Sequence, residues 1–326
     1  MNKSLKAPFP WFGGKSAVAS MVWSRLGQVR NYVEPFYGSG AVLLARPTPF
    51  EGPETVNDLD GLVSNFWRAL AHDPQAVAAA ADWPANENDL HARHAWLVGV
   101  KDSLQARLEG DPEYYDAKIA GWWCWGLACW IGSGFCSGQG PWQVREIDGV
   151  SQLVHVGNQG QGVNRKRVHV GDQGRGVNRQ REAIGQYFEI LTDRLRDVRV
   201  CCGDWSRVCG PSVTSTHGMT GVFLDPPYSA EADRDETLYL KDCPKVAHEV
   251  SAWCRANGDN PLLRIALCGY EGEHDLPGWD CVAWKARGGY GSQSNGRGRA
   301  NAGRERIWFS PACLNPTPDM FSSLIS

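Results

Sequence analysis

The stretch Gly221-Val-Phe-Leu-Asp-Pro-Pro-Tyr228 constrains the fold of this chain more than any other segment. Its apolar, β-prone residues 222–224 predict a short buried strand. Asp225 ends that strand with a carboxylate, and Pro226-Pro227 prevents the chain from continuing as sheet or helix. Ligands bind at the carboxyl ends of strands in open α/β sheets, so the stretch predicts an α/β fold with a binding site here.

An acid, a rigid turn with free carbonyl groups and an aromatic ring can together hold a flat heterocycle that bears an amine. Asp225 and a proline carbonyl would accept hydrogen bonds from the amine, while Tyr228 would stack on the ring. A strand that merely ends in a proline turn beside a surface tyrosine is the alternative. A short motif is only a hypothesis, so the residues upstream have to decide between the two.

The segment upstream begins with Pro8-Phe-Pro-Trp-Phe-Gly-Gly-Lys-Ser16, an aromatic lead into two glycines. Lys15 and Ser16 are predicted to begin a helix, with Ser16 as its cap. A lysine at a helix start opposes the helix dipole, which indicates a ligand contact; a solvated lysine is the alternative.

Residues 31–44 predict a strand (31–34), a glycine-rich turn and a helix. Gly38 and Gly40 in that turn would let the backbone approach a ligand closely, although many tight turns need glycine for steric reasons alone. The chain has neither GxGxxG nor a P-loop, which argues against NAD and ATP.

Residues 54–58 then predict a second strand, which ends in Asp58. An acid about twenty residues after such a turn commonly binds ribose hydroxyls. A cap on the next helix (61–70) is the alternative. The order of strand, glycine turn, helix, strand and acid favours a nucleoside-type site.

Three features of the remaining chain bear on its architecture. Residues 73–116 are predicted to be helical. Five tryptophans between 122 and 142 are expected in the core, with a stacking surface or a wall of the ligand pocket as alternatives. A helix is expected on the spacing of Ile184, Tyr187, Phe188, Leu191 and Leu195, and another over 244–255. Strands are expected over 198–202, 262–268, 280–285 and 304–309.

Charge is distributed unevenly along this chain of net charge −3: residues 51–116 hold thirteen acids and four bases, whereas 154–181 hold six bases and one acid. Residues 154–181 are also a tandem 14-residue repeat, which predicts a hairpin or a pair of loops. Its Arg and Lys suit phosphates and its Gln and Asn suit base edges, although a flexible basic loop is the alternative. Residues 288–303 form a second basic, glycine-rich loop.

Several function classes are disfavoured. The eleven cysteines include no CxxC pair and no zinc-type Cys/His spacing, so no metal is expected. No secretion signal and no apolar run of membrane-spanning length is found, so we expect a cytoplasmic protein without membrane contact.

The ordered motifs Phe9-Pro-Trp-Phe-Gly-Gly-Lys15, Glu34-Pro-Phe-Tyr-Gly-Ser-Gly40, Asn57-Asp58 and Asp225-Pro-Pro-Tyr228 resemble the Dam-type DNA adenine methyltransferases. In this α-ordered group the target-recognition region precedes the DPPY motif. The tail Arg304-Glu-Arg-Ile-Trp-Phe-Ser-Pro311 resembles the close of phage-borne members. The segment from about 71 to 182 matches less clearly, and the tandem repeat is not expected from the family pattern.

The resemblance implies a Rossmann-like α/β methyltransferase sheet (residues 1–70 and 183–326) with an inserted helical and glycine-rich target-recognition region (71–182). It implies S-adenosylmethionine as cofactor, double-stranded DNA as partner and a bacterial or phage-infected cell as location. Cofactor contacts are expected from Trp11, Lys15, Glu34, Phe36, Gly38, Gly40, Asp58 and Asp225.

The same resemblance implies that an adenine flips out of the duplex and meets a catalytic group formed by Asp225, Pro226, Pro227 and Tyr228. The basic segments supply the expected DNA contacts: Arg165, Lys166, Arg167, Arg175, Arg179, Arg181, Arg297 and Arg299. Cytosine-N4 methylation, RNA adenine methylation and a catalytically silent DNA-binding relative stay open as alternatives. Methylation of a glutamine amide is disfavoured, because that pocket carries Asn in place of Asp225.

Overall fold

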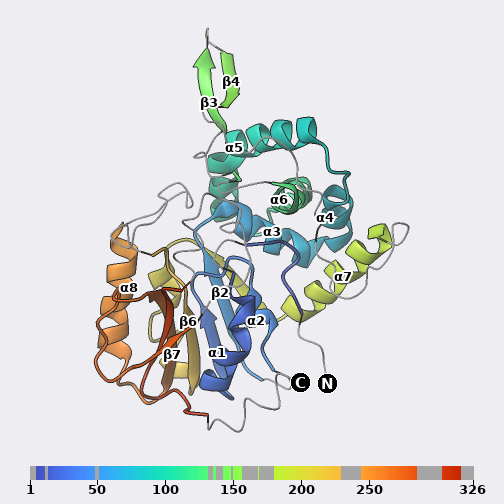
Figure 1. Ribbon diagram of the computed structural model, residues 1–326. Coiled ribbons are helices and arrows are strands. Elements are labelled where there is room, and N and C mark those ends of the chain that lie inside the picture. The colour runs from blue at the N-terminus through green and yellow to red at the C-terminus, as the bar shows by residue number, and fades with distance from the viewer. Residues whose placement is uncertain are drawn as a thin grey trace.

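A seven-stranded mixed sheet forms the centre of the computed structural model, in the order β5-β2-β1-β6-β7-β9-β8 (Figure 1). The structure describes residues 5–11, 14–47, 51–130, 135–136, 142–147, 150–155, 168, 180–228, 244–284 and 303–316. The strands of the sheet are β1 (Asn31–Glu34), β2 (Glu54–Asp58), β5 (Val198–Cys202), β6 (Thr220–Leu224), β7 (Leu263–Tyr270), β8 (Asp280–Ala283) and β9 (Glu305–Phe309). Each strand expected from the sequence is present, so the predicted α/β fold class is confirmed.

The first five strands in that order run parallel, whereas β9 runs antiparallel to both β7 and β8. Strand β1 lies between β2, which follows it in sequence, and β6, which comes much later in the chain. The strand order therefore reverses between β1 and β6. Crevices at such a switch point, outside the carboxyl ends of the strands, are where α/β folds bind ligands.

Eight α-helices and three 3₁₀ turns surround the sheets within the described ranges. They are η1 (Lys15–Ala17), α1 (Ala19–Leu26), α2 (Ala41–Leu44), α3 (Gly61–His72), α4 (Pro74–Ala81), α5 (Glu87–Gly110), α6 (Ala117–Cys129), α7 (Gln180–Leu195), η2 (Trp205–Val208), η3 (Ser215–His217) and α8 (Pro244–Asn257). Short polar side chains start four consecutive helices by accepting a backbone N–H. They are Asp60 for α3, Asp73 for α4, Asn86 for α5 and Asp116 for α6.

The expected helix start at Ser16 is wrong. Residues 15–17 form only the 3₁₀ turn η1, and α1 begins at Ala19 without a side-chain cap. Gly14 precedes the turn in an extended conformation, so the chain reaches helical geometry later than the Lys15-Ser16 pair indicated.

Both faces of the central strands are buried, as the apolar run of β6 predicted. Side chains alternate along β6: Phe223 joins one hydrophobic cluster, whereas Val222 and Leu224 join a second cluster on the other face. The first cluster includes residues of α1, α2, α3 and α7, and the second includes residues of α8. The sheet is thus the middle layer of an α/β/α arrangement (Figure 1).

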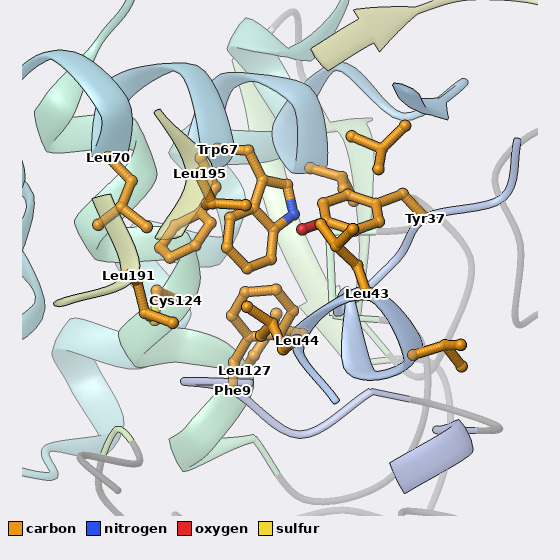
Figure 2. Close-up of a cluster of buried hydrophobic side chains, with 14 of the residues drawn as sticks. Phe9, Tyr37, Leu43, Leu44, Trp67, Leu70, Cys124, Leu127, Leu191 and Leu195 are labelled. Carbon is orange, nitrogen blue, oxygen red and sulfur yellow. The ribbon is translucent and has the colours of Figure 1, made fainter. Parts of the chain in front are cut away.

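The first cluster continues into helices α4, α5 and α6. Trp67 lies in it between Leu70 and Tyr37 (Figure 2). Trp123 and Trp125 of α6 are 2% and 1% exposed, so their predicted place in the core is confirmed. No core boundary separates these helices from α3 and α7, and the division of the chain at residue 71 stays a prediction.

A buried ion-pair network ties α7 to the sheet. Glu54 at the start of β2 is 3% exposed and receives two arginines. Arg46 Nη1 lies 2.8 Å from Glu54 Oε1, and Arg194 Nη1 lies 2.7 Å from Glu54 Oε2. A second Arg194 nitrogen donates to Oε1 at 2.9 Å, which makes that contact bidentate.

The antiparallel hairpin β3 (Trp142–Ile147) and β4 (Val150–His155) projects beyond α5 (Figure 1). It carries the first two residues of the tandem repeat. The rest of the repeat lies outside the described residues, apart from Val168, which is buried, and the first residues of α7. The predicted shape of the repeat therefore stays a prediction.

Candidate active site

A glycine turn at the carboxyl end of β1 forms one wall of the candidate site. Gly38 and Gly40 have φ angles of +48° and +66°, which side chains other than glycine rarely adopt. A Cβ atom on Gly38 would lie 2.4 Å from Nε1 of Trp11, so the indole packs directly on the bare backbone. The Gly38 carbonyl also accepts a hydrogen bond of 3.2 Å from the indole of Trp67. Both glycines are therefore required by shape as well as by conformation.

Asp58 joins this turn to the neighbouring strand β2. Its Oδ2 accepts the Gly38 N–H at 2.9 Å and its Oδ1 accepts the Asp60 N–H at 2.9 Å. Asp60, not Asp58, caps helix α3, so the alternative reading of Asp58 as that cap is wrong. Burial raises the pKa of Asp58 from 3.8 to about 6, although both backbone N–H groups lower it.

Asp225 follows β6 and forms an ion pair with Lys15 across the switch point. The Lys15 Nζ lies 2.8 Å from Asp225 Oδ2, and the two side chains are 5% and 21% exposed. Burial lowers the pKa of Lys15, but the charges of Asp225, Cys268 and Glu305 outweigh it and raise that pKa above its ordinary value. Lys15 is thus a buried cation, which excludes the alternative of a solvated lysine.

Tyr228 lies beside the same ion pair. Its hydroxyl donates a 2.7 Å hydrogen bond to Glu305 Oε2 and lies 3.5 Å from Asp225 Oδ1. The Lys15 Nζ lies 5.5 Å from the centroid of the Tyr228 ring, and the Tyr270 ring packs edge-on at 4.6 Å. Burial, Asp225 and Glu305 raise the pKa of Tyr228 well above 10, so the phenol keeps its proton at neutral pH.

Glu34 at the end of β1 lies deeper in the site. It is 2% exposed and its Oε2 accepts the Tyr32 hydroxyl at 2.8 Å. Burial raises the pKa of Glu34 well above 4.5, and the hydrogen bond from Tyr32 only partly opposes this. Burial therefore disfavours the charged form of Glu34.

A small pocket opens between these elements. It is lined by Trp11, Gly14, Lys15, Glu34, Phe36, Tyr37, Ser39, Ala41, Val42, Phe223 and Asp225. Five of the residues expected to contact a cofactor are thus brought together. Gly38, Gly40 and Asp58 are not in the lining; they adjoin it through Ser39 and Trp11. Phe36 stacks on Trp205, with ring centroids 6.1 Å apart.

Sequence reasoning missed Glu305 and Tyr270 as parts of the site. They lie directly opposite each other in the β7–β9 pairing. Glu305 falls within the strand predicted at 304–309, whereas Tyr270 lies two residues beyond the end predicted for its strand. An acid beside the apolar run at 307–309 was the available signal in the sequence, and the structure shows that this acid is 7% exposed.

The expected DNA contacts fall where the structure gives no side chains. Arg181 lies in the first turn of α7, and only its backbone is described. The others lie outside the described residues: Arg165, Lys166, Arg167, Arg175, Arg179, Arg297 and Arg299. Across the described ranges, no group of three His, Cys, Asp or Glu side chains is arranged to hold a metal ion. No helix in these same ranges is long and apolar enough to cross a membrane.

Part of the chain is similar to known DNA methyltransferases. Residues 11–96 match the model of the D12 class N6 adenine-specific DNA methyltransferase family. Two curated relatives named DNA adenine methylase, from two strains of Vibrio cholerae serotype O1, are each 34% identical to this chain over 88 residues. That alignment covers 27% of this chain and 31% of each relative.

The matched segment contains Trp11, Lys15, the glycine turn and Asp58, whereas Asp225 lies beyond it. The resemblance to Dam-type adenine methyltransferases that the sequence motifs indicated is thereby confirmed.

Proposed function

From this resemblance, we propose that the chain transfers a methyl group from S-adenosylmethionine to the exocyclic N6 amine of adenine in DNA. One observation carries the proposal. Asp225, the carboxylate of the 225–228 turn, stands at the switch point of the sheet and lines a pocket whose other lining residues, apart from Phe223, belong to the segment that matches the methyltransferase family.

Several residues in and around the pocket suit parts of S-adenosylmethionine. Trp11, Phe36 and the glycine turn offer apolar and backbone surfaces to a flat nucleoside, and Asp58 stands one strand away, partly exposed, to accept ribose hydroxyls. Asp225 offers a negative charge near a sulfonium. When bound, the cofactor would supply an electrophilic methyl group.

The protein's own contribution is positioning and polarisation of the amine. Adenine N6 is a weak nucleophile, because its lone pair is delocalised into the ring. Hydrogen bonds from the amine to Asp225 and to the Pro226 carbonyl would favour a tetrahedral nitrogen that points its lone pair at the methyl group. Tyr228 would stack on the base and offset part of the few kcal/mol that unstacking costs.

DNA is the proposed polymer substrate, double-stranded as base flipping requires. The basic repeat (154–181) and the basic loop (288–303) are proposed to contact its phosphates, because their charge contrasts with the acidic residues 51–116. The helices and hairpin of residues 71–182 are proposed as the target-recognition region. The reaction would suit protection of phage DNA or a restriction–modification pair.

Replacement of Asp225 tests the chemistry. Asp225→Ala should lose more than nine-tenths of the turnover while the fold persists, because the amine loses its charged acceptor. The assay follows labelled methyl groups into DNA and identifies the modified nucleoside, which separates N6-methyladenine from N4-methylcytosine. Asp193→Ala is the matched control, since Asp193 forms an exposed pair with Arg196. More than a tenth of wild-type turnover in Asp225→Ala would rule out the proposed role.

Neutralising the repeat tests the DNA contact. Three basic residues would be replaced with alanine together: Arg165, Lys166 and Arg167. We expect weaker binding to all DNA sequences and a salt dependence of log affinity that is flatter by roughly one unit per lost phosphate contact. Cofactor affinity serves as the control and should not change. If the salt dependence of log affinity is unchanged, the loop at 288–303 becomes the better candidate for the DNA contact.

A further inference from the structure

The Tyr228 hydroxyl stands between two carboxylates at unequal distances. Glu305 Oε2 lies at 2.7 Å, a normal length for an O–H···O bond, whereas Asp225 Oδ1 lies at 3.5 Å, beyond the usual range. A neutral phenol has one hydrogen to donate, and these distances direct it to Glu305. Because the pKa of Tyr228 is raised well above 10, that hydrogen is present at neutral pH.

The two carboxylate oxygens of Asp225 therefore have different partners. Lys15 holds Oδ2 at 2.8 Å. The Tyr228 hydroxyl lies 3.5 Å from Oδ1, and its hydrogen is directed to Glu305. Oδ1 therefore keeps its acceptor capacity. The proposed reaction needs such an oxygen, because the target amine must donate a hydrogen bond to Asp225.

We propose that Glu305 is a positioning residue that draws the Tyr228 hydroxyl away from Asp225 and keeps Oδ1 available for the amine of the target base. This inference deepens the proposed function and rests on it. Glu305 touches neither base nor cofactor in this scheme; it acts through Tyr228.

The fold holds Glu305 firmly enough for this task. It lies on β9 opposite Tyr270 of β7, and the Tyr270 ring packs edge-on against Tyr228. With 7% exposure, Glu305 meets little competition from water for the phenol hydrogen. The Lys15 cation helps to balance the two carboxylates, since both Asp225 and Glu305 raise the Lys15 pKa.

Loss of the Glu305 acceptor has a specific consequence. The Tyr228 hydroxyl would turn to the nearest remaining acceptor, Asp225 Oδ1, and occupy the oxygen that the amine needs. Removal of the hydroxyl as well should then relieve the damage. A residue with a purely structural role does not produce such a rescue.

The test measures methyl transfer to DNA in four chains. Glu305→Leu, which keeps side-chain volume without an acceptor, should lower kcat about tenfold or more, the scale of one hydrogen-bond contribution, and leave the cofactor Kd unchanged. Tyr228→Phe keeps the ring that stacks on the base but lacks the hydroxyl that could reach Asp225, so it sets the reference level for the double variant. The double variant Glu305→Leu/Tyr228→Phe should recover to the level of Tyr228→Phe. Glu305→Gln, whose amide oxygen can accept the phenol, should stay within a few-fold of the wild type.

Two further measurements complete the test. Glu271→Gln is the matched control, because the Glu271 side chain is 65% exposed and pairs with Arg306 rather than with Tyr228. A crystal structure of Glu305→Leu, or of Glu305→Ala should the first variant not fold, should bring Tyr228 Oη from 3.5 Å to about 2.7 Å from Asp225 Oδ1. This distance can be measured without any enzymatic activity, so it tests the role of Glu305 independently. Absence of DNA methylation by the wild type would refute the proposed function, not the role of Glu305. Additive losses in the double variant, or an unchanged distance, would overturn the inference.

Discussion

Gly38→Ala should damage the candidate site through two separable effects. Gly38 has a φ of +48°, and a Cβ there would lie 2.4 Å from Trp11 Nε1 and 2.9 Å from two further atoms of the same indole. The first effect is backbone strain, because alanine rarely adopts this positive φ angle. The second requires Trp11, which lines the pocket, to move.

The expected loss can be worked out from these contacts. An L side chain in the left-handed region costs roughly 1–2 kcal/mol. An overlap inside a packed site adds about 1–3 kcal/mol, since real Cβ contacts do not fall below 3.0 Å. Together they predict a loss of about 2–5 kcal/mol in the free energy of unfolding. In the Trp11→Ala background only the backbone part, roughly 1–2 kcal/mol, should remain.

Denaturant unfolding of the four chains in this cycle measures both parts, and calorimetry reports the cofactor Kd in parallel. Gly99→Ala is the control, because a Cβ on this glycine of helix α5 meets nothing within 4 Å and should stabilise the helix by about 0.5–1 kcal/mol. An equal loss of unfolding free energy in the wild-type and Trp11→Ala backgrounds would show that the overlap with Trp11 is relieved at little cost. A loss below about 1 kcal/mol in Gly38→Ala would refute the reasoning altogether.

Two further predictions concern stability. Glu54→Gln should lower the free energy of unfolding by about 3–5 kcal/mol, because it leaves the buried Arg46 and the half-buried Arg194 without their carboxylate; a loss below about 1 kcal/mol in denaturant titration would contradict this. Asp58 has a folded pKa raised to about 6, so its contribution to stability is complete below its ordinary pKa of 3.8 and is lost as pH rises through 6. Relative to Asp58→Asn, the wild type should therefore lose about 1–3 kcal/mol of unfolding free energy between about pH 4 and pH 7. If the unfolding free energies of the two proteins change with pH in parallel, the raised pKa of Asp58 is refuted.

Much of the fold follows from local patterns in the sequence. The strand at 220–224 was predictable, because its apolar run at 222–224 ends in an acid and two prolines. The strands at 31–34 and 54–58 were predictable because short β-prone stretches are followed by a glycine-rich turn or end in an acid. Helix α7 was predictable from its apolar spacing, and the five residues that define this spacing are buried: Ile184, Tyr187, Phe188, Leu191 and Leu195. The start of α1 was not predictable, because the extended backbone at Gly14 delays the helix beyond the residue best suited to cap it.

The hydrogen-bond partner of Asp58 could not be predicted from local sequence patterns. The sequence indicated either a ribose ligand or a helix cap. Only the folded chain shows that its carboxylate accepts the N–H of Gly38, twenty residues earlier. The ribose contact stays a prediction, and the cap belongs to Asp60.

By itself, the sequence determined the order of the motifs, the class of the fold and the chemistry that Asp225 and Tyr228 can offer, because each depends on residues close together in the chain. The tertiary structure alone decided which charges meet. Lys15 pairs with an acid some 210 residues away, and Tyr228 gives its hydrogen to Glu305 rather than to Asp225. Such pairings depend on the strand order and on the antiparallel register of β9, which bring distant residues within a few ångströms and exclude water between them.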